Sequence, residues 1–289
     1  MPPRLHNKIA VITGSSSGIG RATALAFASE GASLICSDIT ETPRSEYATD
    51  TSPSSTTVAA AHALGAKALF VKCDTTSSTD IQALIQTAVK EYGRIDIMVN
   101  NAGISMETSE HGSRPVWEYE EAAFERTVDV NIKGVFLGTK YASKQMVGQE
   151  PGERGDRGWI INLSSVYGLR GTSGISGYAT SKHAVMGLTK SAALDCAPYR
   201  IHVNALCPGY TATAFISSLL TPEAVDMKKE VETRHPFGGL GTPQDIARAA
   251  VFLASEDAAW VTGIGLPVDG GFSCRPKPSK QHPMYTQST

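Results

Sequence analysis

A glycine-rich turn near the start of the chain places the strongest constraint on how the chain folds. Residues 9–13 (IAVIT) form a short apolar run of strand type, and residues 18–30 carry alanine and leucine along one side of a helix. The turn between them has the sequence GSSSGIG at residues 14–20. Glycines at such a position let the backbone approach a pyrophosphate, which the free N–H groups and dipole of the helix N-terminus stabilise. By itself the segment is also compatible with an ordinary turn, so its meaning depends on the rest of the chain.

Short apolar runs and helical stretches alternate along the whole chain, which is the pattern of a parallel sheet covered by helices on both faces. We therefore predict the α/β class, with one doubly wound sheet of seven parallel strands. The expected strands are 9–13, 33–37, 68–72, 95–99, 159–163, 201–206 and 265–268. The expected helices lie near 18–30, 57–64, 78–92, 118–146, 177–197, 222–234 and 243–254. Right-handed crossovers would bring the carboxyl ends of the strands to one rim of the sheet, where ligands bind.

Length and composition fit one domain without a nucleic-acid or membrane partner. At 289 residues and 41% hydrophobic content, the chain can bury one large core. We expect a single domain over residues 1–272 and a flexible polar tail over 273–289. The net charge of −2 gives no basic footprint for nucleic acid, and no apolar stretch approaches the ~20 residues that cross a bilayer. The amino terminus has no apolar signal core, so we expect a cytoplasmic protein.

Metal binding is not expected. The five cysteines are odd in number and, like the seven histidines, show no close metal-ligand spacing. We therefore interpret the cysteines as reduced packing residues. Three polar segments are interpreted as additions to the fold: 40–57 as a flexible excursion, 105–115 on the ligand rim, and 148–158 at the opposite end of the sheet.

Tyr178 and Lys182 lie four residues apart, and Ser165 precedes the tyrosine by thirteen residues. One helical turn, a rise of about 6 Å, places the phenol and the ammonium on one face. A tyrosine hydroxyl titrates near pH 10 in water, and a nearby positive charge favours the phenolate and lowers its pKa. A serine hydroxyl close by would hold a carbonyl or alcohol oxygen against that phenol. The pair alone is more often a solvated helix face, so it gains its meaning from the other motifs.

These motifs occur in the order found in the short-chain dehydrogenases/reductases, a family that the chain resembles from Thr13 to Gly271. The matching pieces are TGSSSGIG at 13–20, Asp74, NNAG at 100–103, Asn131, Ser165, Tyr178 with Lys182, Pro208-Gly209 with Thr213, and VDGG at 268–271. The resemblance implies a Rossmann-type fold and an oxidoreductase that transfers a hydride between a nicotinamide cofactor and a secondary alcohol or ketone.

The resemblance also implies a role for each catalytic residue. Ser165, rather than the neighbouring Ser164, would hydrogen-bond the reacting oxygen. Tyr178 would be the general acid and base, and Lys182 would lower its pKa and bind the nicotinamide ribose. Asn131 would maintain a helix irregularity and a water relay to the lysine. The alternative for Asn131 is a helix-interior asparagine hydrogen-bonded to backbone.

The expected cofactor is NAD, with NADP as the alternative. Asp38 ends the second apolar run, eighteen residues after Gly20, where a carboxylate binds a ribose 2′-hydroxyl and repels a 2′-phosphate. The serines of the glycine-rich turn add no positive charge there, while Arg21 and Arg44 would work against the preference. The expected cofactor-binding residues are Gly14, Ser16, Ser17, Gly18, Ile19, Gly20, Asp38, Asp74, Thr75, Asn101, Ala102, Gly103, Tyr178, Lys182, Pro208, Gly209, Thr211 and Thr213. Asp74 also fits a helix-capping turn, and NNAG also fits a lock for the central sheet.

The substrate cover is expected over residues 210–240. Its apolar side chains are Phe215, Ile216, Leu219, Leu220, Met227 and Phe237, and the remaining wall is assigned to Ile104, Met106 and Tyr167. This lining favours a bulky or cyclic, mostly uncharged substrate. Arg170 is interpreted as an exposed arginine rather than an anion site.

Two other functions and the assembly remain open at this point. A relative of the same fold can use its nicotinamide for epimerisation or ring modification, and a catalytically silent binding protein is less favoured because all the catalytic residues are present. Members of this family pair through long helices and the final strand, so we expect a homotetramer, with a dimer as the alternative. The apolar surface assigned to pairing comprises Phe136, Tyr141, Ala142, Met146, Ala184, Leu188, Ala192 and Leu194.

Overall fold

The computed structural model describes residues 3–43, 55–108, 111–219 and 224–274, and it contains one sheet of seven parallel strands. Its strands are β1 (Ile9–Thr13), β2 (Ser33–Asp38), β3 (Ala68–Lys72), β4 (Ile97–Asn100), β5 (Gly158–Leu163), β6 (Ile201–Pro208) and β7 (Gly265–Val268), and their order is β3-β2-β1-β4-β5-β6-β7. The chain builds outward from β1 in one direction and then returns to build outward from β4 in the other. The predicted doubly wound α/β fold is therefore confirmed, and the point of reversal between β1 and β4 is where such sheets bind ligands.

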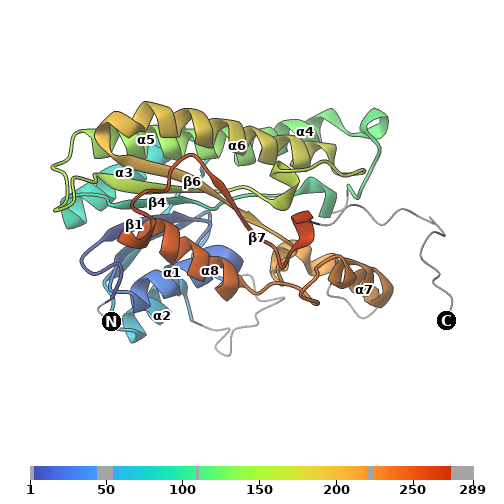
Figure 1. The fold of residues 1–289 in the computed structure, drawn as a ribbon, viewed down its shortest axis with the longest axis horizontal. Helices are drawn as coiled ribbons and strands as arrows, with labels where there is room; N and C mark the ends of the chain where they lie inside the picture. Colours follow the sequence, from blue (N-terminus) through green and yellow to red (C-terminus); the bar gives the residue numbers. More distant parts are fainter. Residues whose placement is uncertain (1–2, 44–54, 109–110, 220–223, 275–289) are drawn as a thin grey trace, which may run out of the picture.

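Helices cover both faces of the sheet (Figure 1). The layer on one face comprises α1 (Gly18–Ser29), α2 (Thr57–Ala63) and α8 (Pro243–Ala254), and the layer on the other comprises α3 (Ser78–Tyr92), α5 (Val135–Val147) and α6 (Ser176–Cys196), with α4 (Glu121–Val128) against α6. A further helix, α7 (Val225–Thr233), stands apart from both layers near the end of β7 in Figure 1. Within the described part of the chain, no helix has the length and apolar character that a bilayer crossing needs.

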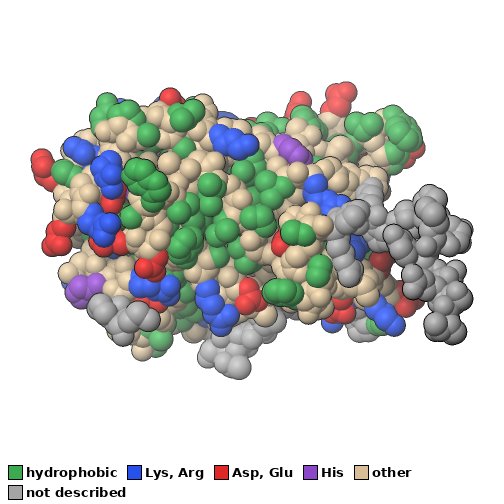
Figure 2. All heavy atoms as spheres, viewed as in Figure 1, with side chains coloured by type: hydrophobic (Ala, Val, Ile, Leu, Met, Phe, Trp, Pro, Cys, Tyr) green, Lys and Arg blue, Asp and Glu red, His purple; other side chains and the backbone are tan. Residues whose placement is uncertain are grey.

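Strand β7 forms one edge of the sheet, and hydrophobic side chains gather over it between α6 and α8 (Figure 2). Trp260, in the loop before β7, is 94% exposed, and Ile264 is also exposed. A monomer that leaves an apolar strand edge open presents a surface suited to pairing with another chain.

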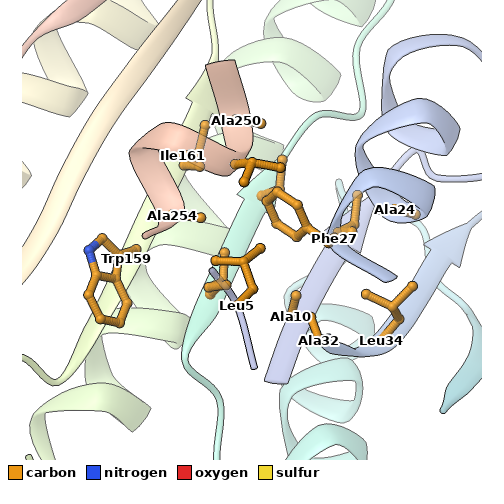
Figure 3. Packing of buried hydrophobic residues seen from close by; sticks show 14 of the residues in the cluster. Leu5, Ala10, Ala24, Phe27, Ala32, Leu34, Trp159, Ile161, Ala250 and Ala254 are labelled. Atoms are coloured by element: carbon orange, nitrogen blue, oxygen red, sulfur yellow. The ribbon is translucent and has the colours of Figure 1, made fainter. Parts of the chain in front are cut away.

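Small residues let α1 and α8 approach the sheet closely. Phe27 of α1 is fully buried between the two helices and the sheet, next to Ala250 and Ala254 of α8 (Figure 3). Ile161 of β5 lies under the same group (Figure 3). Because α1 is fixed in this way, the turn that precedes it is held at the carboxyl end of β1.

The long helix expected over 118–146 is interrupted, so that prediction is wrong in detail. Helix α4 ends at Val128, residues Asp129–Gly134 form a π-type segment, and α5 follows. The wide turn brings Gly134 so close to Thr75 that a Cβ would lie 2.9 Å from the Thr75 hydroxyl oxygen. Asn131 within it turns its side chain to another segment, as described below. The irregularity implied by the family resemblance at Asn131 is thus present.

Other element ends differ by a few residues. The strand expected over 95–99 begins at Ile97, because the Asp96 carboxylate accepts the Ile9 N–H at 2.9 Å and Gln149 Oε1 accepts the Ile95 N–H at 2.9 Å. Segment 148–158 lies at this amino-terminal end of the strands, as expected. Residues Phe272–Cys274 form a 3-10 turn at the start of the predicted tail. Residues 275–289 and most of the predicted 40–57 excursion lie outside the described residues, and the division into one domain and a tail stays a prediction.

Candidate active site

A cavity of about 850 Å³ opens at the carboxyl ends of the strands and contains nearly all the residues singled out from the sequence. It brings the glycine-rich turn, which follows β1, into one space with Ser165 after β5 and Tyr178 on α6. The predicted site residues that line it are Gly14, Ser17, Gly18, Ile19, Asp38, Asp74, Thr75, Asn101, Ala102, Gly103, Ser165, Tyr178, Lys182, Pro208, Gly209, Thr211 and Thr213.

Three predicted residues lie behind the cavity wall instead of lining it. Ser16 is buried, and its backbone N–H donates to Asp38 Oδ2 at 3.2 Å. Gly20 packs against the turn, where a Cβ would overlap the Gly14 carbonyl oxygen. Asn131 is fully buried. These residues support the cavity wall from behind, and their predicted roles in cofactor binding and catalysis stay predictions.

The glycine-rich turn has the geometry of an anion cradle. Gly14 and Gly18 adopt φ values of +64° and +54°, which residues with a Cβ rarely adopt. The Asn101 side-chain amide donates to the carbonyls of Thr13 at 2.9 Å and Gly14 at 3.0 Å, which holds the turn open toward the cavity. Helix α1 begins at Gly18, and its N-cap Ser17 provides no side-chain cap. The first turn of α1 therefore fits the pyrophosphate of a dinucleotide.

Two carboxylates stand at the same end of the cavity. Asp38 accepts the N–H groups of Ser16 at 3.2 Å and Ile39 at 2.8 Å, so both oxygens are fixed in orientation. Asp74 accepts the Thr76 N–H at 2.9 Å and the Thr76 hydroxyl at 2.8 Å. The capping turn expected at Asp74 is therefore present, although the cap of α3 itself is Ser77, and both carboxylates also face the cavity.

Tyr178, Lys182 and Ser165 meet at the other end. The Lys182 ammonium lies 5.5 Å from the centre of the Tyr178 ring and donates to the Leu163 carbonyl at 2.8 Å. The Ser165 hydroxyl hydrogen-bonds Tyr178 and also accepts the Tyr167 N–H at 3.2 Å. Phe215 packs on the Tyr178 ring, with 5.7 Å between ring centres. The helical spacing and the fold together thus place an acid, a cation and a hydroxyl around one point.

Loss of hydration dominates the charge states of this group. Burial raises the pKa of Tyr178 well above its usual range, and the Ser165 hydrogen bond opposes that rise. The lowering of this pKa that is expected from Lys182 stays a prediction. Burial also lowers the pKa of Lys182 to about 8. Burial thus disfavours the charged form of both groups, and an opposite charge or a hydrogen-bond partner would favour that form.

Asn131 connects two segments of the site. Its side chain accepts the Ile104 N–H and donates to the Ile104 carbonyl, both at 2.8 Å. The same amide donates to the Ser181 hydroxyl at 3.1 Å, one residue before Lys182. Asn131 thus does hydrogen-bond backbone groups, as the alternative interpretation expected. The backbone that it bonds belongs to Ile104, in the cavity wall.

Part of the expected apolar lining is present in the substrate wall, with some differences. Phe215, Ile216 and Met227 of the expected cover line the cavity, as do Ile104 and Tyr167. Phe237 is 91% exposed, and neither it nor Met106 lines the cavity. Nothing is described of the Leu219 side chain, and Leu220 lies outside the described residues. Arg170 lies 5.3 Å from the Phe272 ring centre and donates to the Phe272 carbonyl at 3.2 Å, so its role is structural.

The sequence analysis missed four charged residues of the wall: Glu107, Arg126, Glu230 and Arg234. No motif marks them, because each comes from a segment whose path depends on packing. In the described part of the chain, no three His, Cys, Asp or Glu side chains group as metal ligands do.

Comparisons with known proteins agree with this geometry. A family model described as "Enoyl-(Acyl carrier protein) reductase" matches residues 14–273. Cyclohexanol dehydrogenase from Acinetobacter sp. is 35% identical over 95% of this chain and 98% of its own length. (+)-Borneol dehydrogenase 2 from Salvia officinalis is 35% identical over 94% of this chain and 92% of its own length. A putative 2-deoxy-D-gluconate 3-dehydrogenase from Agrobacterium tumefaciens, solved with bound NADP, superposes with a TM-score of 0.78 at 31% identity, covering 95% of this chain and 99% of that one.

The fold and the cavity define a Rossmann-type dehydrogenase or reductase. With the family model covering most of its length, the chain belongs to the short-chain dehydrogenase/reductase family, whose members are oxidoreductases that use NAD or NADP.

Proposed function

We propose that the protein transfers a hydride between a nicotinamide cofactor and a bulky or cyclic secondary alcohol or its ketone. One observation carries this proposal: Tyr178, Lys182 and Ser165 converge in the same cavity as the glycine-rich turn and Asp38. A proton-transfer group and a dinucleotide cradle in one space are the two requirements of such a reaction.

Each catalytic residue has a role in this reaction. The Ser165 hydroxyl holds the substrate oxygen against the Tyr178 phenol. Tyr178 takes the hydroxyl proton during oxidation and returns it to the ketone during reduction. Lys182 places its positive charge beside the developing phenolate and binds the nicotinamide ribose. The nicotinamide, when bound, supplies the hydride acceptor or donor.

The cofactor site extends from Asp38 to Thr213. The first turn of α1 would hold the pyrophosphate, Asp38 the adenosine ribose, and Asp74 with Thr75 the adenine. Asn101, Ala102 and Gly103 would lie behind the ribose. The nicotinamide carboxamide would be held after β6 by Pro208, Gly209, Thr211 and Thr213.

NAD is expected to be preferred over NADP. Asp38 presents a fixed carboxylate where the ribose 2′-oxygen would lie, and Arg21, which would oppose the preference, donates to the hydroxyls of Thr57 at 3.1 Å and Ser55 at 3.4 Å. Asp38→Ala should lower the ratio of kcat/KM with NADH to kcat/KM with NADPH by about 10-fold or more, because it removes a repulsion of at least about 1.4 kcal/mol. Asp74→Asn, the control, removes a charge at the adenine end of the site and should weaken the binding of both cofactors alike, which leaves the ratio unchanged. A higher kcat/KM with NADPH in the unchanged protein would refute the preference.

The substrate proposal is tested with a panel of secondary alcohols and ketones, both cofactors and absorbance at the nicotinamide band. The apolar wall, together with the ring-shaped substrates named for two relatives, favours cyclohexanol and borneol over short acyclic alcohols. We expect one cofactor reduced per alcohol consumed. No turnover of any secondary alcohol or ketone in the panel would contradict the proposal.

Assembly into a homotetramer, or failing that a dimer, is expected from the open apolar surfaces. The structure corrects the residues assigned to pairing: Ala142, Met146 and Ala192 are buried within the chain, whereas Phe136 is 46% and Leu194 77% exposed. Light scattering should give four or two times the 30.6 kDa chain mass. Leu194→Glu should reduce that mass, and Leu64→Glu, at an exposed site next to α2, should not. A 30.6 kDa species alone at micromolar concentration would contradict assembly.

A further inference from the structure

Glu107 is a buried carboxylate in the cavity wall that the proposed reaction does not use. It lies in the 3-10 turn η2 (Met106–Thr108), is 6% exposed and lines the cavity. A carboxylate withdrawn from water is costly unless it is hydrogen-bonded. Its partners therefore indicate what it does.

Glu107 accepts three hydrogen bonds, and one of them comes from the backbone of Tyr178. The Tyr178 N–H donates to Oε1 at 2.9 Å, the Tyr119 hydroxyl donates to Oε1 at 2.7 Å, and the Ser105 hydroxyl donates to Oε2 at 2.8 Å. Tyr178 is the third residue of α6, and the N-cap Ile175 has no side-chain cap. Glu107, 71 residues earlier, thus supplies the acceptor that a capping side chain normally provides. Its negative charge also lies at the favourable end of the helix dipole.

The surrounding residues are shaped around this contact. A Cβ at Gly177 would overlap the Tyr119 hydroxyl, so glycine is required where Tyr119 reaches Glu107. Asn131 hydrogen-bonds both the backbone N–H and the backbone carbonyl of Ile104, which lies three residues before Glu107. The short segment between Ile104 and Glu107 is thereby fixed at one end to the π-type segment and at the other to the first turn of α6.

We propose that Glu107 is a positioning residue for Tyr178: its carboxylate holds the first turn of α6 against the cavity wall and places a negative charge next to that turn. The inference rests on the proposed function, in which Tyr178 carries the proton.

The groups that face Tyr178 make the electrostatic part testable. The Ser165 hydrogen bond favours the phenolate, whereas the negative charge of Glu107 disfavours it; Tyr210 and Cys207 disfavour it when they are ionised. The Lys182 ammonium, 5.5 Å from the ring centre, is the cation of this group. Removing the charge of Glu107 while keeping its shape should therefore make Tyr178 easier to deprotonate.

Glu107→Gln separates charge from position. The glutamine carbonyl can take the place of Oε1 and accept both the Tyr178 N–H and the Tyr119 hydroxyl, and its amide can donate to Ser105. Glu107→Ala removes the charge and the contacts together. Glu118→Gln, at an exposed position in the 3-10 turn Val116–Glu118, is the matched control for loss of one negative charge.

The measurements are pH profiles of kcat for oxidation of cyclohexanol, or of borneol where it is faster, and hydrogen exchange of the ligand-free proteins. In Glu107→Gln we expect kcat for oxidation to rise at a pH about 0.5–1 unit lower than in the wild type, with little change in the plateau value of kcat. In Glu107→Ala we expect plateau kcat to fall about 10-fold, with KM for NAD within about 2-fold, and faster exchange over residues 104–108 and 176–180. Glu118→Gln should match the wild type.

Two outcomes would overturn the inference. If the rising limb of the pH profile of kcat does not move in Glu107→Gln, the electrostatic role is excluded. If Glu107→Ala changes neither the hydrogen exchange nor the plateau kcat, the positioning role is excluded. Measuring Tyr178→Phe in the same experiments distinguishes a failure of the Glu107 inference from a failure of the proposed function. If Tyr178→Phe is inactive while the Glu107 variants behave as wild type, only the role of Glu107 is wrong. If Tyr178→Phe is active, the proposed proton carrier is wrong.

Discussion

Tyr178→Phe is expected to lower kcat about 10²–10⁴-fold for the alcohol that the wild type oxidises best. The change removes one hydroxyl and keeps the ring that packs on Phe215, so the fold and cofactor affinity should remain. The loss arises because the variant lacks the hydroxyl proposed to take the proton from an alcohol held at Ser165. Initial rates and cofactor titration of the purified variant, side by side with the wild type, check this expectation.

Tyr141→Phe is the matched control. The Tyr141 hydroxyl pairs with the Ser78 hydroxyl at 2.8 Å, away from the cavity lining, so its removal costs a hydrogen bond without touching the site. Its rate should stay near that of the wild type. A Tyr178→Phe enzyme that oxidised the alcohol at a near wild-type rate would show that another group carries the proton.

The direction of the pH dependence follows from the same group. In the proposed reaction, oxidation needs the phenolate of Tyr178. Because burial raises the pKa of that hydroxyl, the oxidation rate should rise toward alkaline pH and fall as pH drops. Reduction needs the protonated phenol, so its rate should fall at high pH. Tyr178→Phe should abolish both limbs.

Lys182→Met is expected to abolish most activity and yet to stabilise the fold. Burial lowers the pKa of Lys182 from its ordinary 10.5 to about 8, so the folded state disfavours the ammonium. Below about pH 8 the lysine is protonated in both states and its full penalty is present. Between about 8 and 10.5 the unfolded chain binds more protons, so wild-type stability rises with pH and the penalty disappears. The variant should thus gain about 1–3 kcal/mol in free energy of unfolding near pH 7, and the gain should close by pH 10.5.

Urea unfolding of both proteins between pH 7 and 10.5 measures this difference, because other titrating groups cancel between them. Cofactor affinity should also fall in the variant, because we propose that the ammonium binds the nicotinamide ribose. A variant less stable than the wild type at pH 7 would mean that the hydrogen bond from Lys182 to the Leu163 carbonyl outweighs the cost of burying the charge.

The sheet was predictable from the sequence because each strand is a short apolar run bounded by polar or glycine residues. Parallel strands that are buried on both faces appear in a sequence as continuous apolar runs, without alternation of apolar and polar residues. The break at Asp129–Gly134 was not predictable from periodicity, since the residues on both sides keep the helical pattern and only the contacts of Asn131 and Gly134 separate α4 from α5.

The candidate site divides in the same way. Residues that a motif marks, such as Gly14, Asp38 and Tyr178, lie in the cavity because the ends of parallel strands bring them there. Ser16 and Gly20 belong to the same motif but do not line the cavity, because Ser16 is buried next to Asp38 and Gly20, in the first turn of α1, packs against the Gly14 carbonyl. Glu107 has no motif at all, and its importance depends on a contact across 71 residues that only the folded chain shows.

Oxidation of cyclohexanol that carries deuterium on the carbinol carbon tests the central proposal most directly. A direct hydride transfer predicts one deuterium in each reduced nicotinamide, one ketone per cofactor, and loss of both products in Tyr178→Phe. Deuterium released to water, or an alcohol product of inverted configuration without net cofactor reduction when a chiral alcohol is used, would contradict hydride transfer to the cofactor as the net reaction.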